Sequence, residues 1–195
     1  MKAIFYLILL LGFVVVQSIS SRLKTKYRLL VVGVNQVVFS TILFFLLKVN
    51  YGFKVNFAGF WWFLILFLIT LFFGWFFKAS QAKIPYKLGF EIVVSVGVLM
   101  PLSEEIFFRG ILLYIYPNSV QNAFVFASLH LLNVFSRLEN FSVYNLLYRF
   151  AVGYIFSSSV LKTQSLFCPV LCHTVNNLAA VLVLFFSKNV TNERN

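Results

Sequence analysis

Seven long apolar runs, separated by short segments that carry most of the charges, constrain this chain more than any other feature. They cover roughly residues 3–20, 29–47, 57–77, 88–116, 120–136, 145–161 and 164–187. A helix needs about 20 apolar residues to cross the hydrocarbon core of a bilayer. The runs at 120–136 and 145–161 are shorter, so they either extend into polar flanks or do not cross fully. The pattern predicts an all-α, polytopic transmembrane helix bundle of about seven helices.

The overall composition argues against a soluble fold. Of the residues, 61% are hydrophobic and 11% are charged, whereas soluble domains carry about 25% charged residues. A soluble chain this apolar could not cover its own surface. No linker rich in Gly, Pro or Ser and no repeat of fixed period interrupts the runs. We therefore expect one transmembrane domain over residues 1–187, followed by a short polar tail at 188–195.

The basic residues predict the orientation in the membrane. The formal net charge is +11, but the positive charges lie between apolar runs, which is typical of cytoplasmic loops facing anionic lipid and does not indicate nucleic-acid binding. A basic cluster at 22–28 follows the first run at once, and only Lys2 precedes it. This cluster resists translocation, so we expect a retained first helix in place of a cleaved signal peptide. The N-terminus would then lie outside and the C-terminus in the cytoplasm.

The remaining basic residues agree with this orientation if the chain crosses seven times. Eleven then lie inside, four lie outside, and Arg109 is within the membrane. The inside residues are Arg22, Lys24, Lys26, Arg28, Lys78, Lys83, Lys87, Arg137, Arg149, Lys188 and Arg194. The outside residues are Lys2, Lys48, Lys54 and Lys162.

The two cysteines, Cys168 and Cys172, are four residues apart within one apolar run. This spacing does not describe a disulfide framework. We expect them to be small packing residues of a membrane helix.

Four ionisable residues fall well inside apolar runs: Glu104, Glu105, His130 and His173. Charged groups near the bilayer centre cost about 2.5–3.5 kcal/mol each on insertion scales, so such residues are functional candidates by default. The chain contains no aspartate, and its other glutamates are Glu91, Glu139 and Glu193.

The two adjacent glutamates are expected to differ in their surroundings. Glu105 and Arg109 are four residues apart and can pair on one helix face. Glu104 points about 100° away from Glu105 and has no partner on its own helix. A desolvated carboxylate of this kind can act as a general base or acid. The alternative is that Glu104 has a structural partner on another helix.

The histidines have similar alternatives. His130 follows Phe126 by four residues, and in isolation it could simply bond a backbone carbonyl. His173 and Asn177 share one helix face, so they could donate together to a developing oxyanion. Both could equally be hydrogen-bonding residues between helices, as is common in bilayers.

Depth in the membrane favours a single site. Glu104, His130 and His173 lie about 12, 10 and 9 residues from the outer ends of their runs, which is roughly 14–18 Å at about 1.5 Å per residue. Independent packing residues need not share a depth. Pro101 and Pro169 precede Glu104 and His173 by three and four residues, and each is expected to free a backbone carbonyl and bend its helix.

The three motifs E-E-x-x-x-R, F-x-x-x-H and H-x-x-x-N, in this order on separate helices, resemble those of the CPBP family. This family comprises CAAX prenyl proteases and bacteriocin-processing enzymes, also called Abi-type intramembrane peptidases. The recognisable region is 101–177, and the matching residues are Glu104, Glu105, Arg109, Phe126, His130, His173 and Asn177.

The resemblance implies a role for each residue. Glu104 would activate water with His130 beside it. His173 and Asn177 would stabilise the oxyanion. The second glutamate of the first motif would orient the site through the arginine of that motif.

The resemblance also raises the question of a metal, because the family is often called metalloprotease. Glu104, His130 and His173 would be the ligands of a Zn²⁺ ion. Asn is a poor zinc ligand, however, and a Glu–His pair can activate water unaided. We therefore expect a metal-free glutamate mechanism with no cofactor, and zinc is the alternative.

The implied function is that of an intramembrane endopeptidase acting on a peptide or membrane-protein substrate. Eukaryotic members of the family remove the last three residues of prenylated proteins, and bacterial members are associated with bacteriocin maturation and self-immunity. A short, Phe-rich chain with no soluble domain suits a small member in a bacterial plasma membrane. Two alternatives are a non-catalytic membrane immunity protein and a small proton-coupled transporter, although no inverted repeat is visible between the halves.

Overall fold

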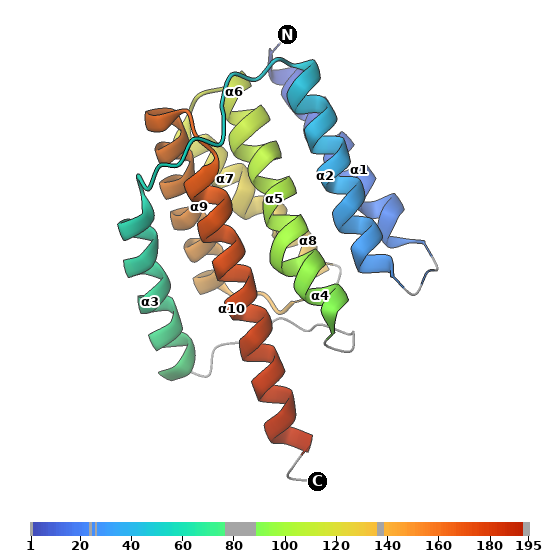
Figure 1. The fold of residues 1–195 in the computed structure, drawn as a ribbon, viewed down its shortest axis with the longest axis vertical. Coiled ribbons are helices and arrows are strands. Elements are labelled where there is room, and N and C mark those ends of the chain that lie inside the picture. Colours follow the sequence, from blue (N-terminus) through green and yellow to red (C-terminus); the bar gives the residue numbers. More distant parts are fainter. Residues whose placement is uncertain (1, 24, 26, 77–88, 136–138, 193–195) are drawn as a thin grey trace. The chain divides into compact units, whose positions relative to one another are not determined.

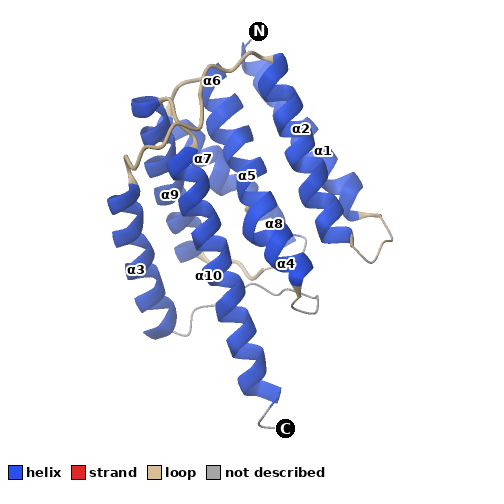
Figure 2. Cartoon of the chain, viewed as in Figure 1, coloured by secondary structure: helices blue, strands red, loops and turns tan. Residues whose placement is uncertain are grey.

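A computed structural model describes residues 2–23, 25, 27–76, 89–135 and 139–192 (Figure 1). Within them the fold is all-helical, with seven helical stretches joined by loops and no strand (Figure 2), which confirms the predicted fold class. Several residues of the orientation argument and the end of the tail lie outside the described residues: Lys24, Lys26, Lys78, Lys83, Lys87, Arg137, Glu193 and Arg194.

Each helical stretch corresponds to one predicted run. The elements are α1 (Lys2–Ser21), α2 (Arg28–Leu46), α3 (Phe60–Phe76), a continuous helix of five segments, α7 (Ser119–Leu129), α8 (Leu131–Phe135), α9 (Val143–Thr163) and α10 (Phe167–Asn192). The five segments are α4 (Phe90–Val94), η1 (Ser95–Leu99), α5 (Met100–Glu104), η2 (Glu105–Leu112) and α6 (Leu113–Ile115), of which η1 and η2 are π-helices.

The two short runs behave differently. The run at 145–161 extends into polar flanks, since α9 has 21 residues and begins after Ser142, whose side chain accepts a hydrogen bond from the Asn145 amide. The run at 120–136 is interrupted at His130, between α7 and α8. Helix α10 continues to Asn192, so residues 188–192 of the predicted polar tail are helical.

Contacts divide the chain into two compact units, each described by itself. The first comprises Met1–Asn50, Leu88–Ile115 and His173–Asn195, and the second comprises Tyr51–Lys87 and Tyr116–Cys172. The single domain expected over residues 1–187 stays a prediction.

In the first unit, α1 packs on α2, and α2 packs along α4, η1, α5 and η2. Phe13 of α1 stacks on the buried Phe107 at 4.3 Å between ring centroids. Helix α2 runs in the same direction as the five-segment helix, because its Leu29 lies beside Glu91 and its Gly33 lies beside Leu99.

Glu91 caps α2 from the neighbouring helix. No side chain of α2's own N-terminal residue fills this role. The Glu91 Oε1 atom accepts hydrogen bonds from the amides of Leu29, at 3.0 Å, and Leu30, at 3.4 Å. These N–H groups have no partner inside the helix, and a carboxylate also suits the positive end of the helix dipole. This contact therefore ties the start of α2 to the start of α4.

In the second unit, α9 is the central helix, with α7 and α3 packed on it. Ser157 of α9 donates a hydrogen bond of 2.8 Å to the Asn122 side chain of α7, and both residues are buried. Phe63 and Phe156 form an apolar cluster with Cys168 and Cys172. The cysteine sulfurs are 3.8 Å apart, too far for a disulfide. Both residues are buried in packing positions, as predicted.

The described helices are suited to lipid. Helices α1 and α2 are long and apolar enough to cross a membrane, and 22% of each apolar window is buried. A core helix of a soluble protein is mostly buried, so the low burial of these two helices agrees with the predicted membrane location. Large apolar side chains of α3 are also exposed, among them Trp61 at 69% and Trp62 at 71%.

Replacing Glu91 tests the cap on α2. Glu91→Ala should lower the free energy of unfolding by about 0.5–2 kcal/mol, the range for loss of a helix cap. Glu91→Gln keeps an acceptor oxygen and should lose less than half of that amount. Thermal unfolding of the detergent-solubilised protein measures the loss in both variants. If Glu91→Ala unfolds with the same free energy as the parent, the cap does not stabilise the protein.

Candidate active site

The two adjacent glutamates lie at a change of helix type. Glu104 ends α5, and Glu105 begins the π-helix η2. Another π-helix, η1, precedes α5, and Pro101 lies in the first turn after it. Single π-turns inside α-helices are frequent at functional sites, because the wider turn changes which side chains converge.

Glu105 is the centre of a buried polar network. Its side chain and that of Arg109 are both fully buried, and Arg109 Nη1 donates to Glu105 Oε1 at 3.1 Å. The pair predicted from the i,i+4 spacing is therefore present. The same Oε1 atom also accepts a hydrogen bond of 2.7 Å from His173 Nδ1 on α10. Sequence reasoning did not find this second contact, which links two motifs 68 residues apart.

His173 lies between the two glutamates. Because a carboxylate accepts hydrogen bonds, the contact with Glu105 places a proton on Nδ1 of His173. The other ring nitrogen, Nε2, is 3.8 Å from Glu104 Oε2. The side chain of His173 is 8% exposed and that of Glu104 is 20% exposed. The sequence left open a structural partner of Glu104 on another helix, and His173 of α10 is such a neighbour.

The charges of this cluster can balance. Glu105 and Arg109 cancel each other. Glu104 and His173 cancel when the imidazole carries a proton on both nitrogens. A neutral cluster costs less to hold in an apolar bundle than one with a net charge. The same total charge results when Glu104 holds the proton and the imidazole is neutral, so the cluster is electrically balanced with this proton on either residue.

Asn177 lies one turn beyond His173 and donates through Nδ2 to the backbone carbonyl of Val96 at 2.9 Å. Its side-chain oxygen accepts a weaker hydrogen bond of 3.3 Å from Asn176. Sequence reasoning treated His173 and Asn177 as two donors available to a substrate. In the structure one nitrogen of the imidazole and one N–H of the amide are already committed within the protein.

His130 belongs to the second unit, where it ends α7. Its Nδ1 donates to the Phe126 carbonyl at 2.8 Å, and the two rings pack edge to face. This is the backbone contact that the sequence left open as an alternative. The association of His130 with Glu104, and their common depth, stay predictions.

The expectation for Pro169 was wrong. Pro169 is the third residue of α10, and the amide of the following residue, Val170, bonds the Leu166 carbonyl just before the helix. The first N–H groups of a helix have no partner inside it, so a proline there breaks no bond. Pro169 therefore does not free a carbonyl beside His173.

Within the first unit the donors are too few for a zinc site, and the third ligand of the zinc alternative, His130, belongs to the second unit, so that alternative stays a prediction. No group of three His, Cys, Asp or Glu able to hold a metal ion occurs among the described residues. Nδ1 of His173 is engaged by Glu105, which leaves one carboxylate and one nitrogen, whereas catalytic zinc uses three protein ligands. Activation of water by a carboxylate at this site does not require a metal ion.

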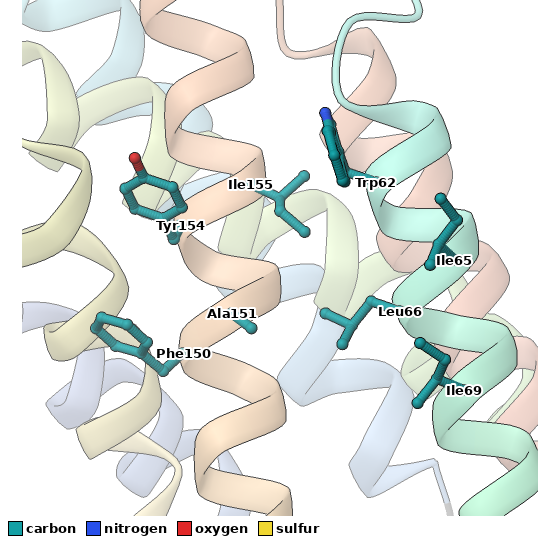
Figure 3. A pocket seen from close by; sticks show the side chains of 8 residues that line it. All are labelled: Trp62, Ile65, Leu66, Ile69, Phe150, Ala151, Tyr154 and Ile155. Atoms are coloured by element: carbon teal, nitrogen blue, oxygen red, sulfur yellow. The ribbon is translucent and has the colours of Figure 1, made fainter.

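A shallow apolar groove lies elsewhere, in the second unit (Figure 3). Its volume is about 400 Å³, and its walls come from α3 and α9. It contains none of the candidate catalytic residues. The lining residues are Trp62, Ile65, Leu66, Ile69, Phe150, Ala151, Tyr154 and Ile155.

The carboxylates and the imidazole of this network lie among apolar helices, and the region that contains them resembles a known family. Residues 87–179 match the family described as type II CAAX prenyl endopeptidase Rce1-like. The match covers 93 of the 195 residues and includes all of the candidate site residues. The match supports the resemblance to the CAAX protease family that the three motifs predict, and the function at the level of that family is that of a membrane-embedded protease. No curated protein and no solved structure matches the chain.

Removing Arg109 tests whether the buried pair is structural. Arg109→Ala leaves the fully buried Glu105 without its counter-charge, which should cost about 3–5 kcal/mol. We expect less folded protein in membranes, measured by quantitative blotting and by fluorescence-detected size exclusion. Arg109→Lys keeps the charge and should lose less. An Arg109→Ala protein that accumulates and unfolds like the parent would contradict a structural role.

Proposed function

We propose that this protein is an intramembrane endopeptidase that hydrolyses a peptide bond with water activated by Glu104. The observation that carries the proposal is the position of His173, which is bonded to Glu105 through one ring nitrogen and faces Glu104 with the other. A carboxylate orienting a histidine in this way is the arrangement that hydrolases use to fix an imidazole for catalysis.

The first step of the proposed reaction uses Glu104 as the general base. Its carboxylate accepts a proton from a water molecule, whose oxygen forms a bond to the carbonyl carbon of the scissile peptide. The carbonyl π-electrons move to oxygen, which becomes an oxyanion. The C–N bond then breaks, and the nitrogen takes the proton from Glu104 and leaves as an amine.

His173 stabilises the oxyanion in this scheme. Because Nδ1 already donates to Glu105, a donor at Nε2 requires the doubly protonated ring. In this scheme the carboxylates of Glu105 and Glu104 each face one ring nitrogen and stabilise that form. A positioned donor of this kind typically accounts for about 10²–10³ in rate.

Two further roles rest on the family resemblance. His130 acts with Glu104 on the water, and its tautomer, with the proton on Nδ1, leaves Nε2 as an acceptor. Asn177 is the second donor to the oxyanion that the resemblance implies. One of its N–H groups is donated to Val96, so a single N–H could serve the substrate.

The proposed substrates are peptides or membrane proteins presented within the bilayer. The matched family is described as type II CAAX prenyl endopeptidase, whereas the bacterial members of the family that the motifs resemble are associated with peptide maturation and bacteriocin self-immunity. The basic residues favour a cell-membrane location with the N-terminus outside and the C-terminus in the cytoplasm.

Exchanging the two glutamates for glutamine separately tests the proposed chemistry. Glu104→Gln is nearly isosteric and should abolish turnover, because the amide cannot accept the water proton. Glu105→Gln should reduce turnover and leave a residue of activity, since Gln still accepts a hydrogen bond from His173. Cleavage of a panel of prenylated and unprenylated peptides, or bacteriocin resistance in cells, is compared at equal membrane abundance.

The alternatives have distinct outcomes in the same assay. If Glu104→Gln retained full function, the peptidase proposal would fail and a binding-type immunity protein would be the better account. His130→Ala should also lose nearly all turnover. Activity that survives prolonged chelation supports the metal-free mechanism, whereas loss restored by Zn²⁺ contradicts it.

The proposed orientation has its own test. Reporter fusions after Lys54 and at Lys188 should read extracellular and cytoplasmic, respectively, because an odd number of crossings separates the basic inner segments from the outer ones. Opposite readings would overturn the seven-crossing topology without affecting the site.

A further inference from the structure

The Val96 carbonyl lies about two helical turns before the glutamates, at a position where the π-turn and a proline together remove a backbone donor. In the π-helix η1 the Met100 amide donates to the Ser95 carbonyl, five residues earlier. The next bond of this series would run from residue 101 to the Val96 carbonyl. Residue 101 is a proline, which has no N–H. The orphan carbonyl therefore follows from the sequence and from the π-turn together.

Asn177 supplies the missing donor. Its Nδ2 atom is 2.9 Å from the Val96 oxygen, the distance of a normal N–H···O hydrogen bond. A carbonyl left without a partner in an apolar bundle is costly. The amide of α10 thus replaces the backbone donor that Pro101 removes.

The surrounding packing holds η1 against α10 and α2. A Cβ atom added to Gly97 would lie 2.4 Å from Leu178 Cδ2, so α10 approaches η1 as closely as glycine allows. A Cβ atom added to Gly33 of α2 would lie 3.0 Å from Leu99 Cβ on η1. The wide turn is therefore in close contact with both neighbouring helices.

We infer that Asn177 is a positioning residue for Glu104, in that its amide completes the hydrogen bond that Pro101 removes and so fixes the π-turn η1, from which α5 leads to the glutamates. The inference rests on the proposed function for its effect on turnover. It differs from the role in which Asn177 acts only on the oxyanion, because its effect depends on the residue at position 101.

A double-mutant cycle tests this dependence with four full-length proteins: the parent, Pro101→Ala, Asn177→Ala and the double variant. With Pro101 present, Asn177→Ala should lower kcat about tenfold and change KM less than about twofold, as expected for one unsatisfied carbonyl in the π-turn that precedes the base on the same helix. The Pro101→Ala substitution restores a backbone N–H that can bond the Val96 carbonyl, so in that background Asn177→Ala should cost less than about twofold. An equal loss in both backgrounds would overturn the inference and assign Asn177 to the oxyanion alone.

Thermal unfolding of the same proteins gives a readout that does not need a substrate. Asn177→Ala should lower Tm by about 2–4 °C with Pro101 present and should have little effect in the Pro101→Ala background. Asn35→Ala removes an amide of the same unit that bonds Ser20; it is the matched control and its effect should not depend on residue 101. If Pro101→Ala does not fold, an unchanged Tm of Asn177→Ala still overturns the inference. If the parent protein has no peptidase activity, the proposed function is wrong, but the Tm values of the four proteins still test the inference about Asn177.

Discussion

The hydrogen bonds to a single oxygen atom, Oε1 of Glu105, organise the polar centre of the first unit. Arg109 and His173 both donate to it. The arginine neutralises the buried carboxylate, and the carboxylate fixes the histidine ring. Without the arginine the carboxylate would be an uncompensated charge in an apolar bundle, and without the carboxylate the imidazole would lose its fixed orientation. The position of His173 relative to Glu104 depends on this shared contact.

The geometry of the helix explains how two adjacent glutamates reach the same histidine. Glu104 and Glu105 lie at the junction of α5 and the π-helix η2, so the backbone changes its winding between them. The preceding π-turn, η1, is fixed by tertiary contacts with α2 and α10. Local winding and helix packing together give the site its arrangement, since neither the motif spacing nor the helix type alone brings α10 to both carboxylates.

Much of the helical fold and one contact of the polar centre could be predicted from the sequence. Apolar periodicity and length gave the seven helical stretches, and the i,i+4 spacing gave the Glu105–Arg109 pair. The contact between Glu105 and His173 could not be predicted, because it joins residues 68 positions apart and depends on how α10 packs. The π-turns have no simple sequence signal apart from Pro101. Pro169 was misjudged because the start of α10, which decides whether a proline breaks a bond, is among the least certain features of a sequence-based prediction.

The proposed stabilisation of the oxyanion requires that His173, held by Glu105, is protonated on both ring nitrogens. The chain has only two histidines, so this protonation state can be measured directly. Nitrogen-15 NMR of the detergent-solubilised protein, labelled only at histidine, reports the protonation of both ring nitrogens. We predict one ring with both nitrogens protonated at neutral pH in the parent and loss of that signal in Glu105→Gln. Two singly protonated rings in the parent, unchanged in Glu105→Gln, would contradict the account.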